Sequence, residues 1–366
     1  MTFQKIKNLN YLVIFLLILL SFIGAAGLYS AADGSYQPWA SRHLIRFYVF
    51  LIITLFISFI DIRLIYKYSY LLFIISLLLL ISVEIIGVLG KGATRWIRIF
   101  GFSIQPSELV KITIILALAK YYNDIKFENI KKISFLFFPF LILIIPFSFV
   151  VIQPDLGTSL SIIILGAFIL FSAGVRIWKF ILGIMTTIIS IPIFLQYIKP
   201  YQRDRIVSFL NPESDPLGQG YQLIQSKIAL GSGGATGKGF LQGTQSYLEY
   251  LPEKQTDFIF TLIGEEFGFL GTLFIIMIFI LLIAVCYFIS IKCFHAFGRI
   301  LALGVASNVF IYVFMNIAMV SGLMPVVGIP LPLISYGGSV MLSIMISMGL
   351  VLNVEINYNL KKIKHA

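Results

Sequence analysis

Charged residues are scarce in this chain: Asp, Glu, Lys and Arg make up 12% of its 366 residues. Soluble domains carry about 25%, whereas here apolar residues account for 59% and the mean hydropathy is +0.98. This composition excludes a soluble globular protein. It indicates an integral membrane protein with most of the chain in lipid.

Cysteine and acidic residues are also few. The two cysteines, Cys286 and Cys293, lie in or directly after an apolar run, so they predict neither a disulfide framework nor a zinc site. The 27 basic residues exceed the 16 acidic ones and give a net charge of +11. Enrichment of Lys and Arg in cytoplasmic loops explains most of this excess, so nucleic acid is not an expected partner.

Long apolar runs dominate what is present. A membrane helix needs about 20 apolar residues. The segments that qualify are 11–32, 44–60, 69–90, 107–122, 134–152, 156–173, 177–197, 258–290, 299–321 and 333–355. Lys5 and Lys7 precede the first run as in a signal peptide, but the run is too long for one and further spans follow. We therefore expect a retained helix.

These runs predict an all-α integral membrane protein with about ten transmembrane helices. We expect a single polytopic membrane domain over residues 1–366, with no soluble domain at either end. Residues 198–257, here called the outer loop, form a large extracytoplasmic connection between helices 7 and 8.

Basic residues in the short loops predict the orientation. One set of loops is basic throughout, and we assign it to the cytoplasm together with both termini. Its basic residues are Lys5, Lys7, Arg63, Lys67, Lys120, Lys126, Lys131, Lys132, Arg176, Lys179, Lys292, Arg299, Lys361, Lys362 and Lys364. The other side is basic only at Arg42 with Arg46, at 91–98 and in the outer loop. Because the last two break the rule, an anionic ligand on the outer face would account for them.

The segment KGATRWIRIFGFSIQPSELVK mixes cations with apolar side chains. Lys91, Arg95 and Arg98 alternate with aromatic and aliphatic residues, as in a segment at the membrane interface, and plain headgroup anchoring is an open alternative to ligand binding. Glu108 and Lys111 are spaced i,i+3 on one helix face and can pair. Ionisable residues inside a membrane indicate function, although a purely structural pair is also possible.

Polar residues also mark the outer starts of two other spans. Asp155 in QPDLGTSL is either a helix N-cap or a substrate contact. In GLMPVVGIPLPLISYGGSVML, the prolines and SYGGS predict irregular backbone, which at membrane depth must be buried or line a cavity. Ser335, Tyr336, Gly337 and Gly338 are therefore candidates for a cavity wall.

The outer loop concentrates charge and glycine. Arg203 and Arg205 lie two positions apart, and guanidinium groups hold phosphate oxygens with bidentate geometry; Lys227 is a further cation. The glycines of GSGGATGKG let the backbone approach a ligand closely, or they simply shape a compact loop. This stretch lacks the GxxxxGK[ST] spacing of a nucleotide-binding loop, so we reject that function.

The outer loop ends in LPEKQTDFIFTLIGEEFG. Asp257 lies where loop becomes helix, and it is either a helix-end charge or a general base for a substrate at the membrane surface. Glu265 and Glu266 follow about 12–14 Å deeper at 1.5 Å per residue. At that depth they must face a cavity or partners rather than lipid.

Together these motifs resemble those of the RodA/FtsW (SEDS) family of bacterial cell-wall polymerases. The resemblance covers nearly the whole chain and rests on GA-RWI with QPSE, QPD-GTS, the long outer loop, PE with DF, and the prolines before SYGGS. GTQSYLEYLPE and the pair Thr256-Asp257 are more similar to the elongation-type branch, RodA, than to the division-type branch, FtsW.

The resemblance implies glycosyl transfer at the bacterial cytoplasmic (inner) membrane. The family polymerises lipid II, a disaccharide-pentapeptide on undecaprenyl diphosphate, into glycan strands. It works with a class B penicillin-binding protein as transpeptidase and with elongation-complex membrane proteins. Asp257 matches the family's essential acidic residue in PE-x-H-T-D-F. Gln255 replaces the usual histidine, so a proton-relay or metal-ligand role of that histidine is lost or moved here.

For this reaction we expect Asp257 to take the proton of the acceptor hydroxyl while cations stabilise the departing diphosphate. Candidate substrate ligands are Arg203, Arg205, Lys111, Glu108, Asp155, Lys227 and Ser335. A divalent cation, Mg²⁺ or Mn²⁺, could share the role of the cations. No His/Asp cluster defines a metal site in the sequence, and no organic cofactor is expected.

Two other functions fit parts of the sequence. A lipid II flippase or other transporter agrees with about ten spans and intramembrane charge, but no inverted repeat is visible and a flippase needs no large outer loop. A noncatalytic scaffold for a penicillin-binding protein is the second alternative. Glycan chains formed from lipid II alone would separate the enzyme from both.

Overall fold

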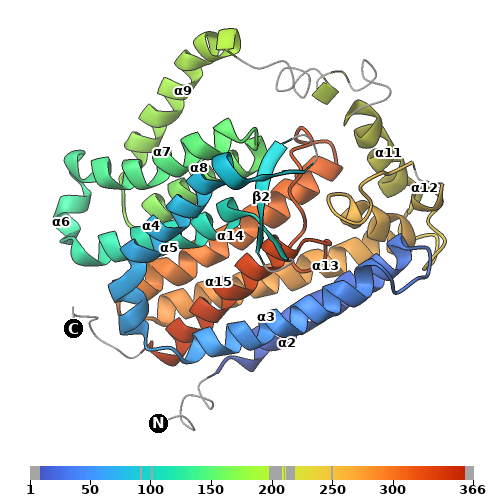
Figure 1. The fold of residues 1–366 in the computed structure, drawn as a ribbon, viewed down its shortest axis with the longest axis horizontal. Coiled ribbons are helices and arrows are strands. Elements are labelled where there is room, and N and C mark those ends of the chain that lie inside the picture. The colour runs from blue at the N-terminus through green and yellow to red at the C-terminus, as the bar shows by residue number, and fades with distance from the viewer. Residues whose placement is uncertain are drawn as a thin grey trace.

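A computed structural model describes residues 9–90, 93–99, 102–197, 208–209, 211, 219–248 and 250–358. Before the outer loop the helices are α2 (Tyr11–Ala31), α3 (Trp39–Phe59), α4 (Ile62–Ile86), α5 (Pro106–Asp124), α6 (Phe127–Ile130), the 3-10 helix η1 (Ser134–Leu136), α7 (Phe137–Ile152), α8 (Leu156–Ser172) and α9 (Ile177–Tyr197). From the outer loop onward they are α11 (Gln219–Ser232), α12 (Thr244–Tyr247), α13 (Ile259–Lys292), α14 (Ala296–Val320) and α15 (Gly338–Ile356). Three strands, β1 (Val88–Gly90), β2 (Ala93–Ile99) and β3 (Phe102–Ile104), lie between α4 and α5 (Figure 1).

Each predicted apolar segment coincides with a helix, so the chain is a mostly helical, multi-pass membrane protein. Within the described part of the chain, seven helices are long and apolar enough to span a membrane: α2, α3, α4, α7 with η1, α13, α14 and α15. Shorter apolar helices include α8 and the first part of α9. By contrast, α5 carries Glu108, Lys111 and Lys120, which lower its hydropathy.

The prediction of an all-α fold is wrong for the segment between α4 and α5. There β2 pairs antiparallel with β1 and with β3, in registers that include Val88 opposite Trp96 and Ile97 opposite Ile104. The sequence ATRWIRI alternates β-branched and aromatic residues with cations, which suits a half-buried strand. In keeping with this, Ile97 is buried and Arg98 is exposed.

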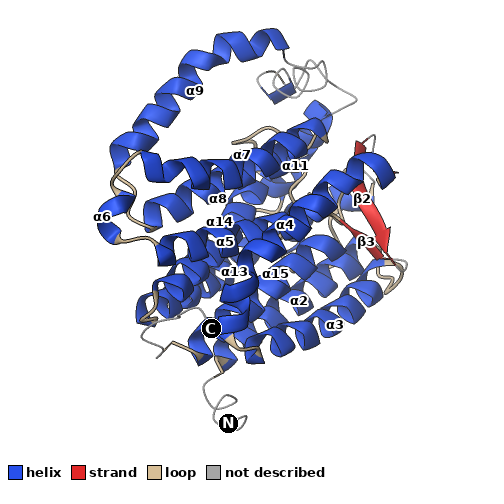
Figure 2. Cartoon of the chain, turned by 60° about the vertical axis from the view of Figure 1, so that its left-hand side comes forward, coloured by secondary structure: helices blue, strands red, loops and turns tan. Residues whose placement is uncertain are grey.

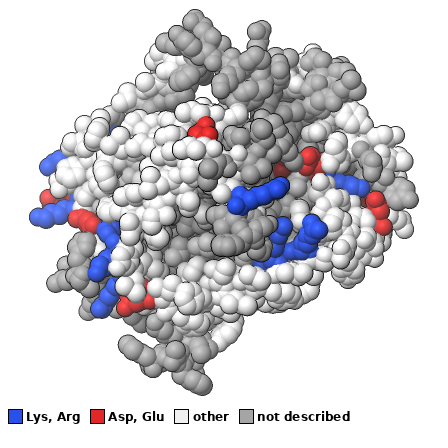
Figure 3. Space-filling view, in the orientation of Figure 1, with Lys and Arg blue, Asp and Glu red and all other residues white. Residues whose placement is uncertain are grey.

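The centre of the bundle is formed by α5 and α14. Helix α5 packs against α4, α7, α8 and α14, while α14 also contacts α13 and α15. Most side chains of both helices are buried. In both ribbon views α9 projects away from this bundle (Figures 1 and 2). Charged side chains form only a few groups on the face shown in Figure 3, as expected for a surface that mostly contacts lipid.

Helix α2 begins, and helix α15 ends, on the same side of the bundle. Asn10, the N-cap of α2, donates from Nδ2 to Glu355 Oε1 near the end of α15, over 3.1 Å. This contact agrees with the expectation that both termini lie on one side of the membrane.

A glycine-rich part of the outer loop packs against a break in α13. At Gly268 the helix has φ 64° and ψ −160°, so its neighbouring backbone groups need other partners. Residues 233–239 supply them: Phe269 N donates to Gly234 O over 2.9 Å, and Gly239 N donates to Glu266 O over 3.0 Å. These contacts favour the interpretation in which the glycines shape a compact loop.

We expect Gly237→Ala to destabilise the fold by about 1–3 kcal/mol, because Gly237 has φ +82° and a Cβ there would lie 2.0 Å from Glu266 O. The matched control is Gly231→Ala, since a Cβ on Gly231 meets nothing within 4 Å. Thermal unfolding of both variants in detergent measures the difference. Equal midpoints would contradict the assigned packing.

Candidate active site

A cavity of about 380 Å³ lies where β2, the starts of α5 and α8, the residues before α13, helix α14 and the segment 327–340 meet. Its lining residues are Arg95, Trp96, Gln105, Glu108, Lys111, Asp155, Thr158, Thr256, Asp257, Tyr312, Val327, Gly328, Ile329, Pro330, Tyr336, Gly337, Ser339 and Val340. Two cations and three carboxylates therefore share one partly open cavity. The predicted site residues Glu108, Lys111, Asp155 and Asp257 are brought together here from distant parts of the sequence.

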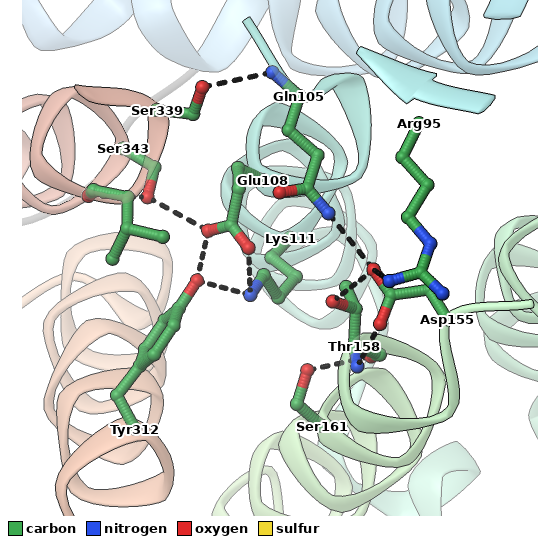
Figure 4. A network of polar contacts seen from close by, with 11 residues as sticks. Arg95, Gln105, Glu108, Lys111, Asp155, Thr158, Ser161, Tyr312, Ser339 and Ser343 are labelled. Carbon is green, nitrogen blue, oxygen red and sulfur yellow. Dashed lines mark hydrogen bonds and ion pairs between the residues drawn. The ribbon is translucent and has the colours of Figure 1, made fainter. Parts of the chain in front are cut away.

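Glu108 and Lys111 form a buried ion pair, as their i,i+3 spacing predicts. The distance from Lys111 Nζ to Glu108 Oε1 is 2.9 Å, and the two residues are 3% and 1% exposed. Tyr312 on α14 joins them: its hydroxyl accepts from Lys111 Nζ and donates to Glu108 Oε2 (Figure 4). Ser343 Oγ also donates to Glu108 Oε2, over 3.2 Å. Every charge in this cluster thus has a polar partner, as burial requires.

Asp155 caps α8 and lines the cavity as well. Its carboxylate accepts from Thr158 N at 3.2 Å and from Thr158 Oγ1 at 2.9 Å, which confirms the capping interpretation. Gln105 Nε2 donates to the same carboxylate over 2.9 Å, and Arg95 NH1 lies 3.9 Å from it (Figure 4). Arg95 also donates to the carbonyls of Gln153 and Pro154, so β2 is fixed to the start of α8.

Asp257 lies two residues before α13 and contributes to the cavity wall, as its position at the loop–helix boundary predicts. Gly328 stands opposite, because a Cβ placed on this glycine would lie 3.5 Å from Asp257 Oδ2. Gly328 has φ +71°, a conformation that glycine adopts at little cost. The backbone of the 327–330 segment can thus approach the carboxylate closely.

Ser335 does not line the cavity, contrary to its prediction as a wall residue. Its hydroxyl faces the backbone instead: Oγ accepts from Leu331 N over 2.7 Å and donates to Thr256 O over 2.6 Å. Tyr336 and Gly337 do contribute to the wall, whereas Gly338 packs against the Arg46 guanidinium. The irregular backbone is therefore partly buried and partly cavity-lining.

The other predicted cations are Lys227, Arg203 and Arg205. Lys227, on α11, is exposed and packs against Gly322, and it is not among the residues that line this cavity, so its role as a substrate ligand stays a prediction. Arg203 and Arg205 lie outside the described residues. The cations that line the cavity in the described part of the chain are Arg95 and Lys111.

Glu265 and Glu266 face polar partners of their own, which was one of the two predicted alternatives. Lys238 Nζ lies 2.7 Å from Glu265 Oε1, and Ser30 Oγ donates to Glu266 Oε1. Both carboxylates are buried beneath the glycine-rich loop and are separate from the cavity lining. They join the outer loop to α13.

Two residues of the site region, Tyr312 and Asn316, carry no signal in the sequence, and no individual role is predicted for Gln105 of the QPSE motif. Tyr312 and Asn316 lie in an apolar helix that holds no charge near them, and Gln105 precedes a helix start as many polar residues do. Their contacts in the structure reveal their place. Gln105 contacts Asp155, Tyr312 contacts Glu108, and Asn316 contacts the Asp257 carbonyl.

The fold and the cavity define a class: a multi-pass membrane protein that holds cations and carboxylates together in a cavity between helix ends and a small sheet. A family model described as cell cycle protein, for FtsW, RodA and SpoVE, matches residues 7–360. The chain belongs to this family.

Relatives and solved structures agree with this assignment. The chain is 44% identical to the peptidoglycan glycosyltransferase MrdB of Escherichia coli (strain K12) over 288 residues, 78% of this chain and 76% of that protein. It is 38% identical to the probable peptidoglycan glycosyltransferase FtsW of Trichlorobacter lovleyi over 363 residues, 96% of this chain and 94% of that protein.

A solved structure on the coordination of polymerization and crosslinking by a peptidoglycan synthase complex contains a chain of similar fold. Its TM-score is 0.83 at 30% identity, and the match covers 96% of this chain and 98% of that one. A mutant of the rod shape determining protein RodA of Thermus thermophilus has a TM-score of 0.73 at 24% identity, with 96% and 99% covered, and shares the fold.

Proposed function

We propose that this chain is a peptidoglycan glycosyltransferase that polymerises lipid II into glycan strands during cell elongation and rod-shape maintenance. The observation that carries the proposal is the cavity, where Asp257 shares one space with Lys111 and Arg95. A base and cations placed together are what a glycosyl transfer with a diphosphate leaving group requires. The names of the relatives support the same reaction.

In the proposed reaction, Asp257 accepts the proton of an acceptor sugar hydroxyl. The hydroxyl oxygen attacks the anomeric carbon of the donor, and the bond from that carbon to the diphosphate oxygen breaks. The undecaprenyl diphosphate leaves with the electron pair, and the configuration at the anomeric carbon inverts. One base suffices, because no covalent intermediate forms.

The departing diphosphate needs positive charge. Arg95 is suited to this role because its side chain is 25% exposed and reaches the cavity while Asp155 orients it. Lys111 stands deeper and is neutralised by Glu108. Arg203 and Arg205 remain candidates for the same role.

A divalent cation is a further part of the proposal. The described residues include no group of three His, Cys, Asp or Glu side chains that could hold a metal ion. Mg²⁺, however, commonly binds one or two carboxylates together with substrate phosphates. Mg²⁺ or Mn²⁺ bound to the substrate diphosphate would neutralise charge on the leaving group, while Asp257 keeps the role of the base.

We place the chain in the bacterial cytoplasmic (inner) membrane as one polytopic domain of ten spans, with α5, α8 and α9 crossing beside the seven longer helices. Both termini are cytoplasmic and the outer loop faces the wall. A class B penicillin-binding protein is the proposed partner, supported by the similarity to a chain of a peptidoglycan synthase complex. Elongation-complex membrane proteins complete the assembly.

The test uses the purified chain and fluorescent lipid II in detergent. We expect a ladder of glycan chains that a muramidase digests. Lipid II that stays monomeric, in preparations that bind the partner transpeptidase, would support the scaffold instead.

The position of Gln255 leads to a separate expectation. Gln255 is not among the cavity-lining residues, and its carbonyl accepts from Tyr336 N over 2.9 Å. We therefore expect Gln255→His to leave the polymerisation rate and its pH dependence unchanged, since the backbone contact does not depend on the side chain. A new titration in the pH–rate profile of this variant would show that the side chain does reach the reaction.

A further inference from the structure

The three residues that end the outer loop, Gln255, Thr256 and Asp257, are all held by their carbonyl groups. Tyr336 N donates to Gln255 O over 2.9 Å. Ser335 Oγ donates to Thr256 O over 2.6 Å, and Asn316 Nδ2 donates to Asp257 O over 3.0 Å. Three successive carbonyls thus receive donors from α14 and from the SYGG segment, which lie 59 to 81 residues further along the chain.

The donors stand on rigid supports. Asn316 and Ser335 are 0% and 3% exposed, and the turn Leu331–Ser335 is buried throughout. Helix α2 presses on this turn at Gly24, where a Cβ would lie 2.6 Å from Leu333 O. A polar side chain held by such packing keeps one geometry.

Asn316 also connects the two sides of the cavity. Its second contact runs from Nδ2 to Ile329 O over 2.7 Å, and Ile329 follows Gly328, the residue opposite the Asp257 carboxylate. One amide group therefore sets the spacing between the backbone that carries Asp257 and the backbone that faces it.

We infer that Asn316 and Ser335 are positioning residues for Asp257: together with Tyr336 N they form a three-carbonyl clip that fixes the base against the reacting hydroxyl. The clip rests on the proposed function. Because the contacts are made to the backbone, neither side chain needs to touch the substrate. Their removal acts on the orientation of the base, and a misplacement of about 1 Å can reduce a rate about 10²-fold.

Two sets of variants test the clip. Asn316→Leu removes both donor contacts, and Asn353→Leu is its control. Asn353 is equally buried and holds the carbonyls of Ile57, Ser58 and Ile60 at 3.0, 3.2 and 2.6 Å, far from the cavity. Ser335→Ala removes the hydroxyl, Ser335→Thr keeps it, and Ser347→Ala is the control because the Ser347 hydroxyl is buried without a partner.

The readouts are the unfolding midpoint and the separate kcat and KM for lipid II. We expect Asn316→Leu and Asn353→Leu to lower the midpoint alike, while only Asn316→Leu lowers kcat by about 10²-fold at unchanged KM. Ser335→Ala should lower kcat in the same way, Ser335→Thr should recover part of it, and Ser347→Ala should match the unaltered chain. The serine variants decide the question if Asn316→Leu does not fold.

Asp257→Asn, measured in the same assays, distinguishes failure of the clip from failure of the proposed role of Asp257. Unaltered kcat in Ser335→Ala and Asn316→Leu, with Asp257→Asn inactive, would overturn the clip and leave the proposed function standing. Full activity of Asp257→Asn would overturn the role of Asp257 and the clip with it.

Discussion

Asp257→Asn is expected to abolish polymerisation of lipid II, with a loss of about 10²–10⁴-fold or more in kcat. The amide keeps the size of the side chain and its place in the cavity wall, but it cannot accept a proton from the acceptor hydroxyl. Since the backbone contacts of residue 257 do not involve the side chain, the fold and the unfolding midpoint should stay close to those of the unaltered chain. Initial rates on fluorescent lipid II measure the effect.

Asp33→Asn is the matched control for this loss. Asp33 is an acidic residue near the outer loop whose side chain is 50% exposed, and it pairs with Lys254 over 3.4 Å outside the cavity. Its neutralisation should leave the rate unchanged. A similar decline in both variants would point to a general effect of charge rather than to a base at residue 257.

Lys111→Met should destabilise the protein by about 3–5 kcal/mol, because it leaves the buried Glu108 carboxylate without its cation. Activity should be lost as well, since Lys111 contributes to the cavity wall. Equilibrium unfolding in mixed detergent measures the first effect, and lipid II polymerisation measures the second.

The double variant Glu108→Gln/Lys111→Met distinguishes these two effects. Removing both charges of a buried pair is often close to neutral for stability, so we expect the unfolding free energy to recover while polymerisation does not. Lys179→Met, at an exposed lysine whose Nζ donates to the Lys132 carbonyl over 3.2 Å, should change stability by less than about 0.5 kcal/mol. Normal stability of the single Lys111→Met variant would contradict the ion pair.

Local signals explain which parts of the fold and site could be predicted. The apolar runs predict the helices because lipid leaves backbone groups no other partners. The capping role of Asp155 and the pairing of Glu108 with Lys111 depend on residues three positions apart, and both are observed. Asp257 at the start of α13 follows from the change in composition at that point.

Contacts between distant segments explain what the sequence could not predict. Tyr312 reaches Glu108 across 204 positions, and nothing in the apolar sequence around it marks this contact. The sequence places Ser335 in irregular backbone, but its hydroxyl turns to the Thr256 carbonyl because the buried turn leaves that acceptor within reach. In the sequence nothing distinguishes Lys227 from the other cations of the outer loop, but in the structure its side chain packs against Gly322.

The sequence does not predict the small sheet, because its pattern fits two arrangements. Residues 88–104 combine a short alternating pattern with cations, and the same pattern also suits a segment lying along the membrane surface. Only the pairing of β2 with β1 and β3 separates the two arrangements. The sheet matters for the site, because it carries Arg95 to the start of α8.

In the proposed function this chain itself joins lipid II molecules, with Asp257 as base. The most direct measurement reconstitutes the purified chain, without a partner, in vesicles that contain labelled lipid II, and follows glycan polymer and lipid movement together for the unaltered chain and Asp257→Asn. We expect muramidase-sensitive polymer from the unaltered chain and none from Asp257→Asn. Movement of labelled lipid across the bilayer without polymer, or equal polymer from both proteins, would contradict it.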